Sequence, residues 1–245
     1  MTALSVFRPR RFARLIAADA MNVSRDPMLI FATVLSVTPS IGLWLTRDLI
    51  DDSAFQAAGI TELSRYIVPV ALLLPAFLIG WVTGFLLLED RDDGPLLAVD
   101  VTPVGKTGFL AYRLAVTALL TAAITLGALQ LLLPELDLWL KLLILVLIPA
   151  DAALSAIVLL AVARNKVEGL ALTKLINIAS IVPLIAIIPS PWRLLAGVVP
   201  TYWLGELLDL SGEAILPAVV VAFAAVAIHL VMAAGLLILL RLHVG

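Results

Sequence analysis

The sequence of 245 residues contains no cysteine and only two histidines, His229 and His243. Without cysteine the chain has no disulfide, no thiolate metal site and no cysteine nucleophile. Charged residues are also scarce, at 14% of the chain, against about 25% in soluble domains. The net charge of −2 offers nucleic acid no electrostatic attraction. We therefore expect no metal, no cofactor and no nucleic-acid partner.

Hydrophobic residues make up 62% of the chain, more than the core of a soluble domain of this length can bury. Stretches of about 20 residues with few or no charges recur, and this length crosses a hydrocarbon layer about 30 Å thick. Helices satisfy their backbone hydrogen bonds within one segment, and no β-type alternation is seen. We therefore predict an all-α integral membrane protein with one transmembrane domain over residues 1–245. Its six predicted spans lie near 27–46, 66–88, 110–133, 140–163, 173–189 and 214–240.

The basic residues are unevenly divided between the two sides of this topology. With the N-terminus in the cytoplasm, twelve of the 16 Lys and Arg residues lie inside and four outside. Cytoplasmic loops are enriched in Lys and Arg. We therefore predict a multi-pass protein of the inner or plasma membrane with both termini in the cytoplasm. No small-residue cleavage site follows the first apolar run, which indicates a retained span rather than a signal peptide.

Two segments flanking the spans have unusual composition. Residues 8–24 place apolar side chains among arginines at helical spacing, which predicts an amphipathic helix in the cytoplasmic interface. A basic flank that only orients insertion is the alternative. Residues 189–213 are apolar and aromatic but repeatedly interrupted by proline and glycine. They predict broken external helices, interfacial or re-entrant, before the last span, with an ordinary aromatic belt as the alternative.

The first cytoplasmic loop, 89–108, concentrates acids on the side where bases normally dominate. Acids contribute little to topology, so membrane insertion does not explain them. A turn at Gly94-Pro95 and a closing Thr102-Pro103 make a short amphipathic unit flanked by charge, which suits docking on another protein. A solvated charged loop is the alternative. The candidate docking residues are Glu89, Asp90, Asp92, Asp93, Gly94, Thr102 and Pro103.

Motifs for nucleotide binding and catalysis are incomplete. Gly105-Lys106-Thr107 resembles the end of a phosphate-binding loop, but Asp100 stands where that loop needs its first glycine. Pro103 also removes one of the N–H groups that such a loop offers to phosphate. Neither H-E-x-x-H nor G-x-S-x-G occurs in the chain. We expect no nucleotide site and no enzymatic activity.

Two ionisable residues lie inside predicted spans, Asp151 in the fourth and His229 in the sixth. A charge at the bilayer centre costs about 2.5–3.5 kcal/mol on insertion scales, so Asp151 should face the bundle interior or a wet cavity. Asp151 is a candidate for the substrate path or for a polar link between helices, and helix packing near Pro149 is the alternative. For His229, helix packing or a hydrogen bond between helices is favoured over a proton relay.

The order of these elements resembles the permease subunits of type-2 ABC exporters, including those of bacterial drug and antibiotic exporters. The resemblance is carried by the acidic stretch ending in LAVDVTP (97–103), the loop 165–174 and Pro200-Thr-Tyr-Trp203. In the first cytoplasmic loop, Pro95 after the glycine departs from the family's pattern of acids, glycine and Thr-Pro. The positions that match this pattern are Glu89, Asp92, Gly94, Thr102 and Pro103.

The resemblance implies a subunit that forms the substrate path and depends on another subunit for ATP hydrolysis. A separate cytoplasmic ABC ATPase would dock on residues 89–108 and on the N-terminal helix, and a second permease subunit, identical or different, would complete the path. The implied substrate is a drug, an antibiotic or an amphipathic, lipid-like molecule. The alternatives are an ATP-independent secondary transporter or channel, and a membrane enzyme or assembly factor without transport. Many secondary carriers show internal repeats, which residues 27–134 and 139–240 do not.

Overall fold

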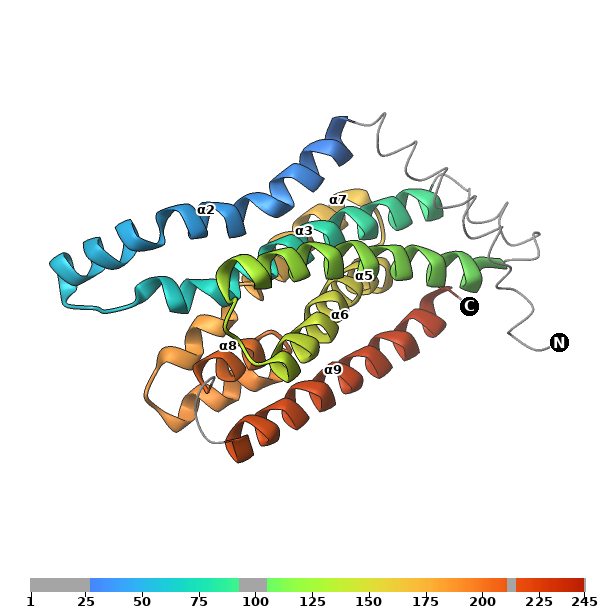
Figure 1. Ribbon diagram of the computed structural model, residues 1–245. Helices are drawn as coiled ribbons and strands as arrows, with labels where there is room; N and C mark the ends of the chain where they lie inside the picture. The colour runs from blue at the N-terminus through green and yellow to red at the C-terminus, as the bar shows by residue number, and fades with distance from the viewer. Residues whose placement is uncertain (1–26, 93–104, 211–214, 245) are drawn as a thin grey trace.

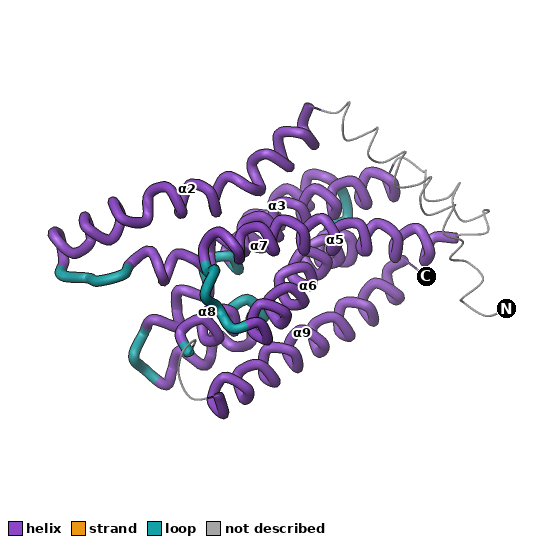
Figure 2. The backbone as a smooth tube through the Cα atoms, viewed as in Figure 1, coloured by secondary structure: helices purple, strands orange, loops and turns teal. Residues whose placement is uncertain are grey.

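The computed structural model describes residues 27–92, 105–210 and 215–244, and within these ranges it contains helices and no β-strand. The predicted all-α class is confirmed. Figures 1 and 2 show long helices lying side by side, with short helices gathered at one end. The elements are α2 (Pro27–Ala58), α3 (Leu63–Asp92), α5 (Gly105–Leu132), α6 (Leu138–Val162), α7 (Lys166–Ile178), η2 (Val182–Ile187), η3 (Pro191–Val198), α8 (Tyr202–Asp209) and α9 (Ile215–Val244).

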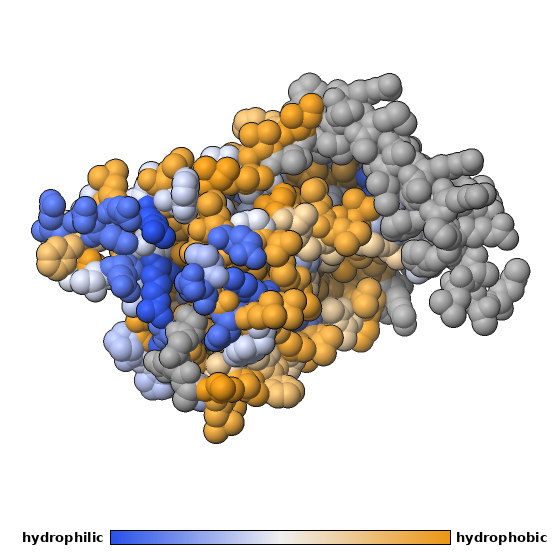
Figure 3. Space-filling model, in the orientation of Figure 1, coloured by the Kyte–Doolittle hydropathy of each residue, from blue (hydrophilic) through white to orange (hydrophobic). Residues whose placement is uncertain are grey.

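The two ends of the bundle differ. One end, which we call the loop end, holds the end of α3, the start of α5, the corner between α6 and α7, and the end of α9 (Figure 1). The other, the broken-helix end, holds η2, η3 and α8. In Figure 3, apolar residues cover the middle of the visible face and polar residues gather at the broken-helix end. An apolar surface bordered by a polar end is expected of a protein surrounded by lipid.

Five described helical stretches are long and apolar enough to cross a membrane: Leu63–Asp92, Gly105–Leu132, Leu138–Val162, Lys166–Ile187 and Ile215–Leu240. They correspond to five of the six predicted spans. The first predicted span, 27–46, falls in α2, which is not among the five, so the sixth span stays a prediction. The predicted interfacial helix at 8–24 lies outside the described residues.

The predicted span at 173–189 is not one continuous α-helix. α7 begins earlier, at Lys166, ends at Ile178, and is followed by the 3-10 helix η2. Pro183 lies near the start of η2, and a proline cannot supply the N–H that an α-helix would need there. The broken helices predicted before the last span are present as η3 and α8, together with η2.

α3 and α6 form the most deeply buried pair of helices, and glycine lets them approach. A Cβ added to Gly80 would lie 2.3 Å from the carbonyl oxygen of Ala152. A Cβ added to Gly84 would lie 2.6 Å from Cδ1 of Leu159. The two glycines are spaced as G-x-x-x-G, the pattern that brings helix backbones together in membranes.

Neighbouring helices also satisfy polar groups that α3 leaves open. Pro75 has no N–H to donate to the carbonyl four residues earlier, at Ala71. The Ser40 hydroxyl of α2 donates to that carbonyl at 3.4 Å. The hydroxyls of Thr83 in α3 and Thr117 in α5 are 2.7 Å apart. In lipid, such side-chain bonds replace the water that a soluble protein would use.

Candidate functional site

Three of the predicted docking acids lie in the last turn of α3, and all three form ion pairs inside the chain. The pairs are Glu89–Lys166 at 3.0 Å, Asp90–Arg113 at 3.5 Å and Asp92–Arg91 at 3.3 Å. Lys166 starts α7 and Arg113 lies in the first third of α5, so the acids join three helices at the loop end. The other predicted docking residues, Asp93, Gly94, Thr102 and Pro103, lie outside the described residues.

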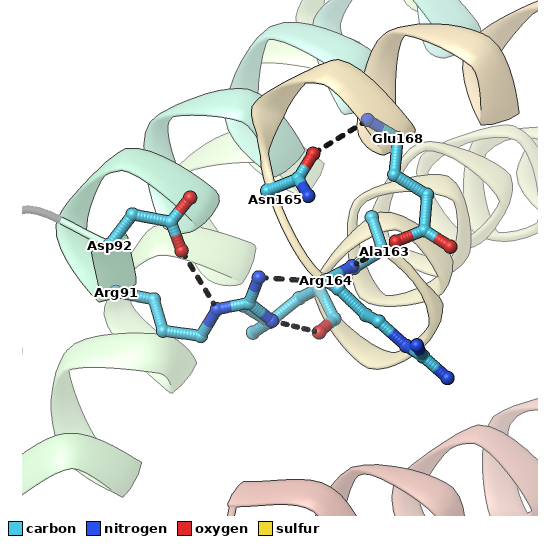
Figure 4. A network of polar contacts seen from close by, with 7 residues as sticks. Arg91, Asp92, Ala163, Arg164, Asn165 and Glu168 are labelled. Carbon is cyan, nitrogen blue, oxygen red and sulfur yellow. Dashed lines mark hydrogen bonds and ion pairs between the residues drawn. The ribbon is translucent and has the colours of Figure 1, made fainter.

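Arg91 binds the end of α6 (Figure 4). Its Nη1 donates to the Leu160 carbonyl at 3.1 Å and its Nη2 to the Ala163 carbonyl at 2.9 Å. The last carbonyls of a helix have no partner within the helix, and a cation there is favoured by the helix dipole. Asp92 holds the third nitrogen, Nε, at 3.3 Å and so orients the guanidinium. Arg91 thus caps α6 from the neighbouring helix α3.

The start of α7 is held by a local cap (Figure 4). The Asn165 side-chain oxygen accepts from the Glu168 N–H at 2.9 Å, and Glu168 Oε2 accepts from the Arg164 N–H at 2.9 Å. Reciprocal bonds of this kind satisfy donors that the first turn of a helix leaves open. A Cβ on Gly169 would lie 2.7 Å from Leu88, so α7 packs directly on α3. The corner between α6 and α7 is therefore fixed against the end of α3.

Asp151 and His229 face each other in the middle of the bundle, from α6 and α9. His229 Nε2 is 3.2 Å from Asp151 Oδ1, and the residues are 6% and 5% exposed. Although the two atoms are this close, Nε2 makes no hydrogen bond of standard geometry. His229 Nδ1 lies 2.7 Å from the Ala225 carbonyl, which fits a protonated Nδ1 donating to that oxygen. No pattern in the sequence pairs these two residues, and the fold brings them together.

We expect a double-mutant cycle at Asp151 and His229 to show coupling. Asp151→Ala leaves a buried imidazole nitrogen without its partner, which should lower the free energy of unfolding by about 1–3 kcal/mol. Replacing both residues with leucine should recover most of the loss, since an apolar pair needs no partner in lipid. Thermal unfolding in detergent measures both effects. Strictly additive losses would mean that the two side chains do not interact.

A second buried charged cluster, at the broken-helix end, was missed by sequence reasoning. Glu206 of α8 is 3% exposed, and its Oε1 lies 3.0 Å from Nε of Arg193. Arg193 Nη2 donates to Oε2 at 3.2 Å, and Nη1 donates to the Ala186 carbonyl at 2.6 Å. The Tyr202 hydroxyl also donates to Glu206. Burial, reinforced by the Glu206 carboxylate, raises the pKa of Tyr202 and keeps it a donor.

This cluster ties three short helices together. Ala186 belongs to η2, Arg193 to η3 and Glu206 to α8. The only local signal in the sequence is the spacing of Tyr202 and Glu206, four residues apart and thus on one face of a helix. Nothing in the pattern indicates that Arg193, on another helix, completes the cluster.

A small pocket lies between the start of α3 and the short helices. Its volume of about 20 Å³ suits a water molecule rather than a drug-sized ligand. We therefore do not assign it as a substrate site. The residues that line it are Arg65, Tyr66, Pro69, Pro183, Ala186, Ile187, Gly205, Leu208 and Asp209.

The sequence matches the family model described as "Fluoroquinolones export permease protein Rv2686c-like" over residues 19–238. It is 32% identical over 213 residues to fluoroquinolones export permease protein MT2760 of Mycobacterium tuberculosis (strain CDC 1551 / Oshkosh). The same identity relates it to fluoroquinolones export permease protein Rv2686c of strain ATCC 25618 / H37Rv, and each match covers 81% of this chain and 82% of the relative. No solved structure shows a significant match. With a family match over most of its length and five apolar helices able to span a membrane, this chain belongs to the Rv2686c-like family of fluoroquinolone export permeases.

Proposed function

We propose that this chain is the permease subunit of an ATP-binding cassette exporter that moves amphipathic drugs of the fluoroquinolone type across the bacterial cell membrane. The observation that carries the proposal is membership of a family described as fluoroquinolone export permeases. The two relatives from Mycobacterium tuberculosis carry the same name and align along most of their length, which supports a shared substrate class.

The proposal assigns ATP hydrolysis to a separate cytoplasmic subunit. Gly105-Lys106-Thr107, the segment that resembles part of a phosphate-binding loop, forms the first turn of α5. The start of a helix is also where a phosphate-binding loop places these residues, but such a loop needs its first glycine at position 100, where this chain has Asp100, and Pro103 removes one of its N–H groups. These departures support a permease that does not itself hydrolyse ATP.

We place the loop end in the cytoplasm, with the ATPase docked there on residues 89–108 and on the N-terminal segment 8–24. Basic residues support this orientation: Arg91, Lys106, Arg113, Arg164 and Lys166 lie at the loop end. The broken-helix end, where η3 and α8 lie, then faces outward, and α2 provides the sixth span. Both chain termini would be cytoplasmic.

A second permease subunit, identical or different, would complete the substrate path. The apolar side chains of α7 and α9 are largely exposed in the single chain, which leaves wide apolar faces for lipid or for a partner subunit. The pocket at the start of α3 is too small for a drug. A path formed between two subunits would not need a drug-sized cavity inside one chain.

The proposed function is tested by fluoroquinolone efflux. We expect cells that express the permease together with its partner ATPase to accumulate less fluoroquinolone than cells that express the permease with an ATPase lacking its catalytic carboxylate. The ATPase should also copurify with the permease in mild detergent. Efflux that persists with the inactive ATPase but stops when the proton gradient is dissipated would instead identify a secondary transporter.

A further inference from the structure

We propose that the last turn of α3 is a transmission clasp, in which Arg91 positions the ends of α3, α6 and α7 so that they move together. The inference rests on the proposed function, because it concerns how an ATPase docked near the end of α3 would drive the bundle. It reassigns Glu89 and Asp90 from contacts with that partner to anchors within the permease.

The polar groups in the last turn of α3 form hydrogen bonds and ion pairs inside the chain. Arg91 uses its three nitrogens on two carbonyls of α6 and on Asp92. The Arg91 and Asp92 side chains are each 27% exposed, and Asp90 with its partner Arg113 is less exposed still. Paired and mostly buried in this way, Asp90, Arg91 and Asp92 have little left to offer a docking protein. Glu89 is more exposed, at 51%, and is joined to α7 through Lys166.

The second support is the packing beneath the polar groups. Leu87 and Leu88 of α3 are buried in one apolar cluster with Leu159 and Leu160 of α6. Leu88 also fills the space that a side chain at Gly169 of α7 would need. A close-packed interior transmits displacement because it has little room to deform. The end of α3 therefore cannot shift without moving the corner between α6 and α7.

The third support is a connection from this corner to the broken-helix end. α7 runs from Lys166 to Ile178, and the turn after it is bound to the start of α8, where the Thr201 hydroxyl donates to the Ala179 carbonyl at 2.6 Å. Displacement of α7 at the loop end thus reaches the short helices at the opposite end.

The test compares Arg91→Ala and Arg91→Lys with Arg164→Ala as a matched control. Arg164 is an exposed arginine of the same corner, and its guanidinium points away from Arg91 (Figure 4). Each variant is reconstituted with the partner ATPase, and bound ATPase, ATP hydrolysis and fluoroquinolone transport are measured. We expect Arg91→Ala to bind the ATPase and hydrolyse ATP within about twofold of wild type but to transport about tenfold less drug per ATP. Arg91→Lys keeps the charge but cannot bind two carbonyls in the same geometry, so its transport per ATP should lie between those of Arg91→Ala and the wild type. Arg164→Ala should match the wild type.

A charge exchange distinguishes an internal anchor from a partner contact. Glu89→Lys alone should weaken transport, and adding Lys166→Glu should restore at least about half of it, because the pair is re-formed with reversed charges. If Glu89 instead contacts the ATPase, the double variant stays as defective as Glu89→Lys. If Arg91→Ala does not fold, the charge exchange between Glu89 and Lys166 tests the proposal in its place.

Hydrogen exchange on the permease alone separates failure of the clasp from failure of the proposed function. Arg91→Ala should speed amide exchange over residues 163–168 about tenfold, and Arg164→Ala should not. Unchanged amide exchange in Arg91→Ala would overturn the clasp. So would a folded Arg91→Ala variant that transports as much drug per ATP as the wild type, or one that no longer binds the ATPase. If the wild-type permease shows no ATPase-dependent transport, the proposed function fails and the transmission role fails with it, while the exchange result still decides whether Arg91 holds the corner.

Discussion

Gly80→Val should prevent stable packing of the permease. A Cβ at this position would lie 2.0 Å from Ser155 Oγ and 2.3 Å from the Ala152 carbonyl oxygen. The hydroxyl could rotate away, but the carbonyl belongs to the backbone of α6, so the two central helices would have to separate. Overpacking of this kind costs about 3 kcal/mol. Thermal unfolding of the purified protein and its recovery as a single species after gel filtration measure the effect.

The matched control is Gly127→Val in α5. A Cβ there has no neighbouring atom within 4 Å, and the residue is exposed. Both substitutions place the same side chain inside an apolar helix, so any difference between them reports the contact with α6 rather than helix propensity. Equal stability of the two variants would contradict the close approach of α3 and α6.

Arg193→Ala should destabilise the broken-helix end by about 3–5 kcal/mol, because it leaves the Glu206 carboxylate buried without its cation. Arg193 also binds the Ala186 carbonyl, so the substitution removes the hydrogen bonds from η3 to Ala186 of η2 and to Glu206 of α8. We expect a lower unfolding temperature in detergent and lower fluoroquinolone transport. Replacing Arg193 and Glu206 together with methionine and leucine should recover much of the stability, since no charge then remains buried.

An exposed ion pair at the same end supplies the control. Arg65 and Glu62 are 4.0 Å apart, and their side chains are about half or more exposed. Pairs of this kind contribute about 0–1 kcal/mol, so Glu62→Ala should barely change the unfolding temperature. If Arg193→Ala were as mild as Glu62→Ala, Glu206 would not depend on its partner in the folded protein.

Some features found in the structure left a local signal in the sequence. Gly80 and Gly84 have the spacing of a membrane packing motif, and small residues at Ala152 and Ala156 have the same spacing on α6. Reading both patterns together would have suggested that these helices pair. The spacing of Tyr202 and Glu206 likewise placed two polar groups on one face of a short helix. Neither pattern identifies its partner without the fold.

Other features left no such signal. Arg91 binds carbonyls 69 and 72 positions away, and any residue at those positions would offer the same backbone oxygen. Composition in the loop 89–108 predicts a docking surface, but nothing in it indicates that three of its acids pair with Lys166, Arg113 and Arg91. A charged residue looks the same in sequence whether its partner lies in another protein or on the next helix.

The sequence by itself determined that this protein is surrounded by lipid, and it determined the number and order of most of its helices. Transfer into lipid depends on the side chains of one segment at a time, so apolar runs and their interruptions are sufficient to place five spans and the broken helices before the last. Only the tertiary structure decided which polar groups meet: Asp151 with His229, Arg193 with Glu206, and Arg91 with the end of α6. Such pairs depend on the rotation and register of helices far apart in the chain, which are set by close packing at residues such as Gly80.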